Sequence, residues 1–293
     1  MTNEHHPAPP HPASDHHDAT DDHDRGLAFD LGTLFSRRRL LTLLAGTGAA
    51  AFVVACGGGS DSAASTVSTA SSATAPATTA AASNASAAVI PEETAGPYPG
   101  DGSNGVNVLD DSGIVRSDIR SSFGSSATTA AGVPLTITFQ VTDASAAGAP
   151  LADAAVYVWH CDREGRYSMY SDGVTGENYL RGVQPTGADG TVTFTSIFPA
   201  AYSGRWPHVH FEVYSSVDDA TAGGSPIATS QIALPEDTCE LVYATSGYEQ
   251  SVRNMQSLSL QTDNVFSDGW EQQLGTVTGD VSSGLAVSLA VPV

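Results

Sequence analysis

Residues 91–293 consist of short runs in which β-branched and aromatic residues recur at every second position, and this alternation restricts the fold more than any other feature. The runs are bounded by Gly, Asp, Ala-Gly or Pro, as is typical of strands separated by turns. No long window carries a helical pattern. About 200 residues with this pattern predict an all-β fold, a β-sandwich with a sizeable core. The expected strands are 135–141, 155–159, 190–196, 209–214, 227–233, 241–244, 258–260 and 285–291, with one short helix expected within 249–258.

The charge balance excludes one large class of partners. The chain has 32 acidic and 11 basic residues, all of the latter arginine, and a formal net charge of -21. Such a chain lacks the basic surface that neutralises phosphates, so we expect no nucleic-acid partner. Three cysteines are too few for a disulfide-built miniprotein.

Residues 1–56 are expected to be a targeting segment with a His- and Asp-rich leader. The leader could bind a metal, or it could be a solvated segment that is later removed. The pair Arg37 and Arg38 precedes an apolar run, 40–55, which is typical of a Tat-type export signal. That run is shorter than the roughly 20 residues of a membrane-spanning helix.

The apolar run ends in Val53-Val54-Ala55-Cys56, which resembles a bacterial lipobox. Acylation of Cys56 would then supply the only membrane attachment; the alternative is an ordinary cleaved signal with an incidental cysteine. Residues 57–90 are rich in Gly, Ser, Ala and Thr and are expected to be a disordered tether. We therefore expect an exported protein, either a cell-surface lipoprotein or a secreted one, whose folded domain spans 91–293.

Four side chains of the expected sandwich form a candidate metal site. His208 and His210 lie two apart in a predicted strand, so both imidazoles face the same side. Tyr202 precedes them in a turn-rich segment, and Tyr167 follows another predicted strand. A His-x-His pair alone is a weak signal, and either tyrosine alone is weaker still. Together the four could hold one ion.

The donor types favour ferric iron. Tyrosine has a pKa near 10, so it binds as phenolate only where the metal strongly stabilises the anion. A hard trivalent ion does so, whereas zinc usually takes His, Cys or carboxylate and blue copper needs a thiolate. We therefore expect one Fe(III) per chain.

At these residues the sequence resembles the intradiol ring-cleavage dioxygenases, and most closely their secreted bacterial branch. The resemblance covers most of 91–293 and is specific because its segments occur together and in order. They are Glu-Thr-Ala-Gly-Pro-Tyr at 93–98, Pro-Leu-Ala-Asp-Ala-Ala-Val-Tyr-Val-Trp at 150–159, Gly-Arg-Tyr at 165–167, Phe-Pro-Ala-Ala-Tyr at 198–202, Arg-Trp-Pro-His-Val-His at 205–210 and Thr-Ser-Gln at 229–231.

The resemblance implies both the site and the reaction. It makes Tyr167, Tyr202, His208 and His210 the ligands of a non-haem Fe(III). It also makes Arg205 the arginine that lies over the substrate and Gln231 a glutamine of the same pocket. The implied partners are a catechol-type aromatic, such as catechol or protocatechuate, and O2. The ring opens between its two hydroxyl-bearing carbons and takes up both oxygen atoms, giving a muconate-type diacid. Tyr202 would detach when catechol binds and accept a substrate proton.

Two further features of the sequence allow more than one interpretation. An oxidising compartment permits a disulfide between Cys161 and Cys239, the alternative being two buried free thiols. His160 could support the site, although its neighbour Trp159 favours a packed strand residue. The segment 148–158 also resembles prealbumin-like cell-surface domains, so a non-catalytic binding module is the alternative function.

Overall fold

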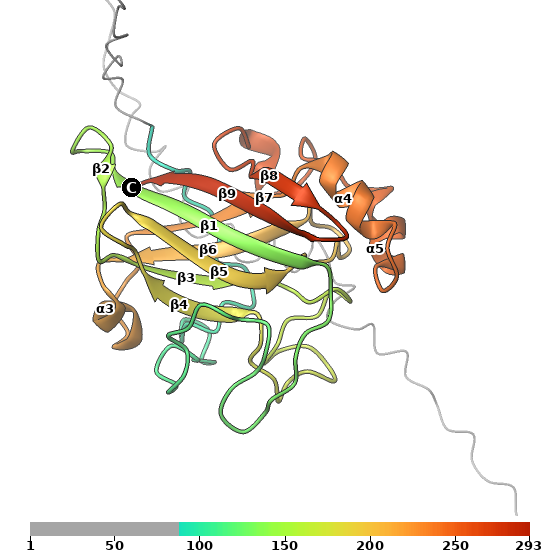
Figure 1. Ribbon diagram of the computed structural model, residues 1–293, viewed down its shortest axis with the longest axis horizontal. Helices are drawn as coiled ribbons and strands as arrows, with labels where there is room; N and C mark the ends of the chain where they lie inside the picture. The colour runs from blue at the N-terminus through green and yellow to red at the C-terminus, as the bar shows by residue number, and fades with distance from the viewer. Residues whose placement is uncertain (1–87) are drawn as a thin grey trace, which may run out of the picture.

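The computed structural model describes residues 88–293, which form two β-sheets packed face to face (Figure 1). The predicted β-sandwich is confirmed. The predictions for Arg37, Arg38, Cys56 and the tether before residue 88 lie outside the described residues. The strands are β1 Pro134–Asp143, β2 Ala149–Pro150, β3 Ala155–Trp159, β4 Arg181–Pro185, β5 Thr191–Ile197, β6 His208–Tyr214, β7 Ala228–Ala233, β8 Thr276–Asp280 and β9 Gly284–Pro292. The helices are α3 Val217–Thr221, α4 Glu236–Tyr243, α5 Glu249–Met255 and the 3₁₀ turn η2 Phe266–Asp268.

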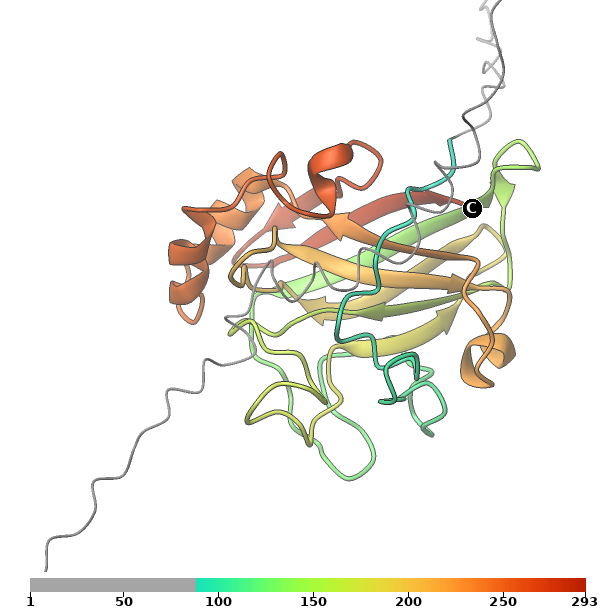
Figure 2. The ribbon, with the colours of Figure 1, turned by 180° about the vertical axis from the view of Figure 1, so that it is seen from behind.

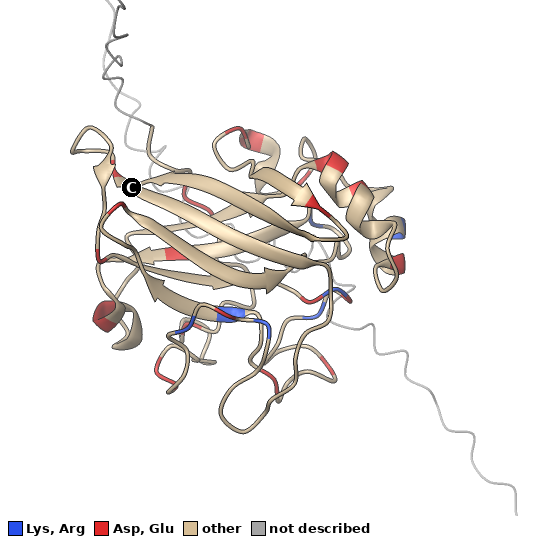
Figure 3. Cartoon of the chain, in the orientation of Figure 1, with Lys and Arg blue, Asp and Glu red and all other residues tan. Residues whose placement is uncertain are grey.

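The first sheet has five strands and one exposed face. Its strand order is β2-β1-β9-β8, with β5 also paired to β1. Residues along β1 and β5 alternate between buried and more exposed, so every second side chain points into the sandwich. The strands of this sheet contain almost no charged residues, as the tan ribbons nearest the viewer in Figure 3 show.

The second sheet has four strands in the order β4-β3-β6-β7, and it is covered on both faces. All residues of β3, β6 and β7 are buried. Val209, Phe211 and Val213 of β6 point toward the five-stranded sheet, and the alternate residues point outward. The outward face is therefore buried without being part of the core between the sheets.

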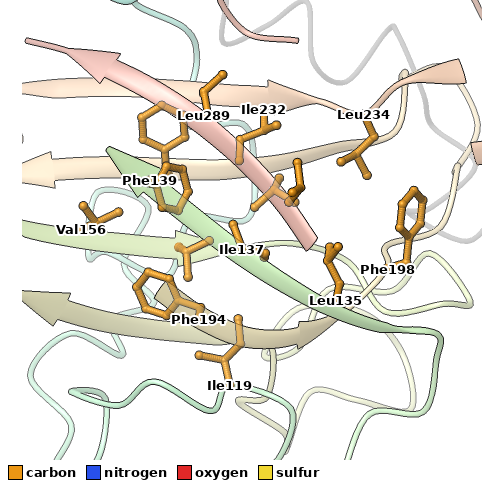
Figure 4. Packing of buried hydrophobic residues seen from close by; sticks show 14 of the residues in the cluster. Ile119, Leu135, Ile137, Phe139, Val156, Phe194, Phe198, Ile232, Leu234 and Leu289 are labelled. Carbon is orange, nitrogen blue, oxygen red and sulfur yellow. The ribbon is translucent and has the colours of Figure 1, made fainter. Parts of the chain in front are cut away.

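The core between the sheets is built from the inward residues of both. Phe139 packs on Phe194 and Phe211, with ring centroids 6.4 Å and 4.9 Å apart. Figure 4 shows aliphatic side chains from both sheets packed around Phe139 and Phe194. Burial of these side chains supplies the main stabilisation of the sandwich.

The first described residues cover the outer face of the four-stranded sheet. Seen from behind, this segment crosses the strands (Figure 2). Glu93 N–H donates to the Thr229 carbonyl at 2.7 Å, and the Gln231 side chain donates to the Thr94 carbonyl at 2.9 Å. Gly96 has a φ of +70°, and a Cβ there would lie 3.2 Å from a ring atom of His210. Only glycine fits this close approach without strain.

Two strand predictions were wrong, and five elements were missed. Residues 241–244 end helix α4, whose buried positions Thr238, Cys239, Val242 and Tyr243 follow a helical spacing after Pro235. Residues 258–260 lie in a loop, outside any helix or strand, and the predicted helix in 249–258 is α5. The missed elements are β2, β4, β8, α3 and η2. Within residues 88–293, no helix is both long and apolar enough to cross a membrane.

Candidate metal centre

His208 and His210 project from the outer face of β6 toward one point. Their Nε2 atoms lie 3.1 Å apart, with the two rings nearly perpendicular at 82°. Strand pairing sets Trp159, His210 and Gln231 side by side across β3, β6 and β7. The indole of Trp159 stacks on the His210 ring, with centroids 4.8 Å apart and an angle of 4°. The sheet thus fixes the direction in which both imidazoles point.

Two tyrosines from separate loops reach the same point. The Tyr167 hydroxyl lies 3.4 Å from His208 Nε2, and the Tyr202 hydroxyl lies 3.3 Å from the same atom. Tyr167, His208 and His210 are buried, whereas Tyr202 is only half-buried. Four donor atoms from 167, 202, 208 and 210 therefore converge, with Tyr202 on the more exposed side.

A backbone contact fixes the tautomer of His208. Its Nδ1 lies 2.5 Å from the carbonyl oxygen of Trp206, which can only accept a hydrogen bond, so Nδ1 carries the proton. The lone pair is then on Nε2, which faces the other three donors. A second hydrogen bond of this kind is how proteins orient a metal-binding histidine.

Burial keeps both imidazoles neutral. Loss of hydration, with a contribution from the Arg205 charge, lowers the pKa of His208 to about 3. Burial and the neighbouring His208 likewise lower the pKa of His210 well below its usual value. Both rings therefore offer lone pairs at neutral pH without first losing a proton.

The Tyr167 phenol, by contrast, holds its proton unless a cation lies beside it. Burial, with a further contribution from Tyr202, raises the pKa of Tyr167 well above 10, so its phenolate forms only beside a compensating cation. Two neutral imidazoles and two phenol oxygens fit a hard, highly charged ion such as Fe(III). In residues 88–293, no group of three or more His, Cys, Asp or Glu side chains could hold a metal. The candidate centre therefore depends on its tyrosine oxygens.

The loop that carries Tyr167 is held by a buried carboxylate. Asp162 accepts hydrogen bonds from the backbone N–H groups of Glu164 and Arg166, and from the Tyr179 hydroxyl at 2.9 Å. The Tyr167 N–H donates to the Ser171 hydroxyl at 2.8 Å. These contacts restrict the loop, so the position of Tyr167 is set by its surroundings.

Arg205 lies buried beside the four donors. Its Nε donates to Asp263 Oδ2 at 3.0 Å, and its Nη2 donates to Gln231 Oε1 at 2.7 Å. The side chains of Arg205 and Asp263 are each about 1% exposed. The structure therefore brings the predicted Arg205 and Gln231 together. It adds Asp263, which the sequence analysis missed because a single aspartate 58 positions away carries no motif.

His160 is a buried residue whose two ring nitrogens both lie within hydrogen-bond distance of groups outside the four donors. One ring nitrogen lies 2.8 Å from the Cys161 carbonyl and the other lies 2.6 Å from the Ser196 hydroxyl. Its ring therefore joins the end of β3 to β5. This agrees with the packed role that Trp159 suggested.

The disulfide considered for Cys161 and Cys239 is absent. Both thiols are free and buried. Cys161 Sγ lies 3.6 Å from the Ala200 carbonyl, whereas Cys239 packs in the core between the sheets. Burial raises the pKa of both thiols, so neither is a reactive thiolate at neutral pH.

The folded domain is similar to several known proteins. A family model described as Dioxygenase matches residues 118–213. The intradiol ring-cleavage dioxygenase from Tetranychus urticae is 25% identical, with a TM-score of 0.55, over 70% of this chain and 93% of that one. The dioxygenase domain of a carbohydrate-binding fusion protein from Streptomyces sp. SirexAA-E is 24% identical over 69% of this chain and 96% of that chain, with a TM-score of 0.44. Catechol 1,2-dioxygenase from Pseudomonas arvilla C-1 is 22% identical over 69% of this chain and 61% of that chain, with a TM-score of 0.44.

The fold comparison rests on the Tetranychus urticae structure, which has the highest TM-score of the three. No curated protein sequence matches the chain. The family model and this structure confirm the resemblance that the motifs predicted: the folded domain is similar, in sequence and in fold, to the intradiol ring-cleavage dioxygenases.

Proposed function

We propose that the protein is an exported, non-haem Fe(III) intradiol dioxygenase that opens the ring of a catechol-type aromatic. The observation that carries this proposal is the convergence of Tyr167, Tyr202, His208 and His210 on one point. The similarity to an intradiol ring-cleavage dioxygenase supports it. A prealbumin-like binding module has no need of four such donors beside a buried arginine.

The four donors would hold the iron, one per chain. Bound ferric iron acts as a Lewis acid, which lowers the pKa of a catechol and favours its dianion. The buried, neutral histidines and the restricted Tyr167 suit permanent ligands, because their positions are set by β6 and by the loop.

Tyr202 and Arg205 have different roles in this proposal. Tyr202, the more exposed of the two phenols, is placed to accept a proton from an incoming catechol hydroxyl. The guanidinium of Arg205 stays charged at any relevant pH and stabilises negative charge that develops on the ring and oxygen atoms. Gln231 holds that guanidinium through its amide oxygen. Both atoms of O2 enter the product, so catechol would give a cis,cis-muconate-type diacid.

The test is a turnover panel with the full-length protein. Oxygen uptake and product identification are measured with catechol, hydroxyquinol, protocatechuate and larger lignin-derived catechols. We expect equal consumption of oxygen and of at least one catechol, with a ring-opened diacid as product. A protein that binds catechols but consumes no oxygen would instead support the binding module.

We also propose that the protein is exported by the Tat pathway and retained by a lipid at Cys56. Arg37, Arg38 and Cys56 motivate this proposal. Replacing both arginines with Lys should trap the protein in the cytoplasm, and Cys56→Ala should release it from the membrane fraction. If both variants fractionate like the wild type, the lipoprotein proposal fails.

A further inference from the structure

The ion pair between Arg205 and Asp263 is the most deeply buried charge pair next to the candidate site, and its acidic partner has no assigned role. Asp263 lies just before the η2 turn, while Arg205 lies just before β6. The two residues are 58 positions apart, so the fold alone brings them together. A carboxylate buried this deeply is costly to keep unless its oxygens are well paired.

Both oxygens of Asp263 are fully used. Oδ2 accepts from Arg205 Nε at 3.0 Å and from the Trp206 backbone N–H at 2.7 Å. Oδ1 accepts from the backbone N–H groups of Val265 and Phe266 at 2.8 Å and 3.2 Å. All four contacts come from donors, so the site requires an ionised carboxylate and has no place for a side-chain amide N–H.

Oδ2 of Asp263 thus joins the Arg205 side chain to the backbone segment that leads into β6, the strand that carries the histidines. Asp263 Oδ2 accepts a hydrogen bond from the backbone N–H of Trp206, and the backbone carbonyl of the same residue fixes the tautomer of His208. The same Oδ2 holds the guanidinium of Arg205, whose other end is held by Gln231. The position of the positive charge relative to His208 is therefore set by this oxygen.

We propose that Asp263 is a positioning residue, which acts through Arg205 to place its positive charge beside the substrate. This inference rests on the proposed function. It goes beyond that function by giving Asp263 a role: this carboxylate holds Arg205 where its positive charge lies beside the substrate. In this role Asp263 itself contacts neither the four donors nor the substrate.

The test is a double-variant cycle in the full-length protein, made from Arg205→Gln, Asp263→Asn and the two combined. The measurements are iron per chain, kcat with the best catechol, and the affinity for 4-nitrocatechol followed by its absorbance without oxygen. We expect Asp263→Asn to keep its iron and to lose about tenfold or more in kcat. In the Arg205→Gln background the same change should cost less than about twofold, because its effect runs through the arginine.

A general structural role predicts a different result. An equal loss of rate in both backgrounds, or no loss in Asp263→Asn, would overturn the proposal. Glu212→Gln is the matched control, because Glu212 is also a buried carboxylate, lies in β6, and has its hydrogen bond with Tyr214 and not with the four donors. It should keep kcat. If Asp263→Asn does not fold, Asp263→Glu keeps the charge and displaces it, and the same loss in kcat is expected.

Failure of the proposed function would be recognised separately. If the iron-loaded wild type turns over no catechol, the proposed function fails, and the affinity for 4-nitrocatechol then decides the role of Asp263. Weaker binding of 4-nitrocatechol by Asp263→Asn, but not by Glu212→Gln, would support the positioning role of Asp263. Unchanged binding by Asp263→Asn would overturn that role. A wild type that neither binds 4-nitrocatechol nor consumes oxygen overturns both proposals.

Discussion

The two sheets of the sandwich have similar inner faces and very different outer faces. The outer face of the five-stranded sheet meets solvent and carries small polar residues such as Thr193 and Ser288. The outer face of the four-stranded sheet is covered by the 90–100 segment and by loops, and it carries His208, His210 and Glu212. Covering a sheet on its second side removes water from its polar groups, and this loss of hydration shifts their pKa values.

The largest expected difference between these faces is in stability. Trp159 of β3 lies on the covered outer face and is fully buried, so Trp159→Ala should lower the free energy of unfolding by roughly 3–5 kcal/mol. Ser288→Ala on the open outer face of β9 should change it by no more than about 0.5 kcal/mol. Urea unfolding of both variants checks this. Similar losses at the two sites would show that the faces do not differ as described.

The pH dependence of stability provides a second comparison. Burial raises the pKa of Glu212 from 4.5 to about 7. Between these values the folded carboxyl keeps a proton that the unfolded chain releases, so stability falls as the pH rises through this range. Relative to Glu212→Gln, the wild type should lose up to roughly 3 kcal/mol from pH 4.5 to 7. Parallel pH profiles of the two proteins would contradict this effect of burial.

Substitution of Arg205 tests whether the covered outer face of the four-stranded sheet contributes to catalysis as well as to packing. Arg205→Ala should retain iron, because arginine is not a ligand, and should lose roughly 10²-fold in kcat/KM for the best catechol. Metal analysis and oxygen uptake measure the two effects. Full activity of Arg205→Ala would show that Arg205 has no role in catalysis.

Tyr202 is expected to show the smallest effect on iron among the four donors. It is the more exposed phenol, so Tyr202→Phe should retain more iron than His208→Ala, with an altered visible band and slow turnover. Metal content and the absorption spectrum measure this difference. Iron loss as complete as that of His208→Ala would assign Tyr202 the same role as the histidines.

Local patterns predicted much of this molecule. Alternation at every second residue predicted β1, β3, β5, β6, β7 and β9, and the His-x-His spacing placed two imidazoles on one face. The pattern of 241–244 predicted a strand, but its apolar residues belong to the end of helix α4, which begins after Pro235. The contact between Arg205 and Asp263 could not be predicted, since it joins residues that are distant in the chain and share no motif. Nor could the sequence decide between free thiols and a bridge for Cys161 and Cys239.

The central claim is that the covered outer face of the four-stranded sheet holds one ferric ion between two histidines and two tyrosines. Iron content and the visible spectrum of the purified full-length protein test it most directly, with a His208→Ala, His210→Ala double variant beside the wild type. The wild type should contain one iron per chain and show the red-brown colour of an iron–phenolate pair, and the double variant should have neither. A colourless wild type that holds no iron after ferric loading, or a double variant that keeps its iron, would contradict the claim.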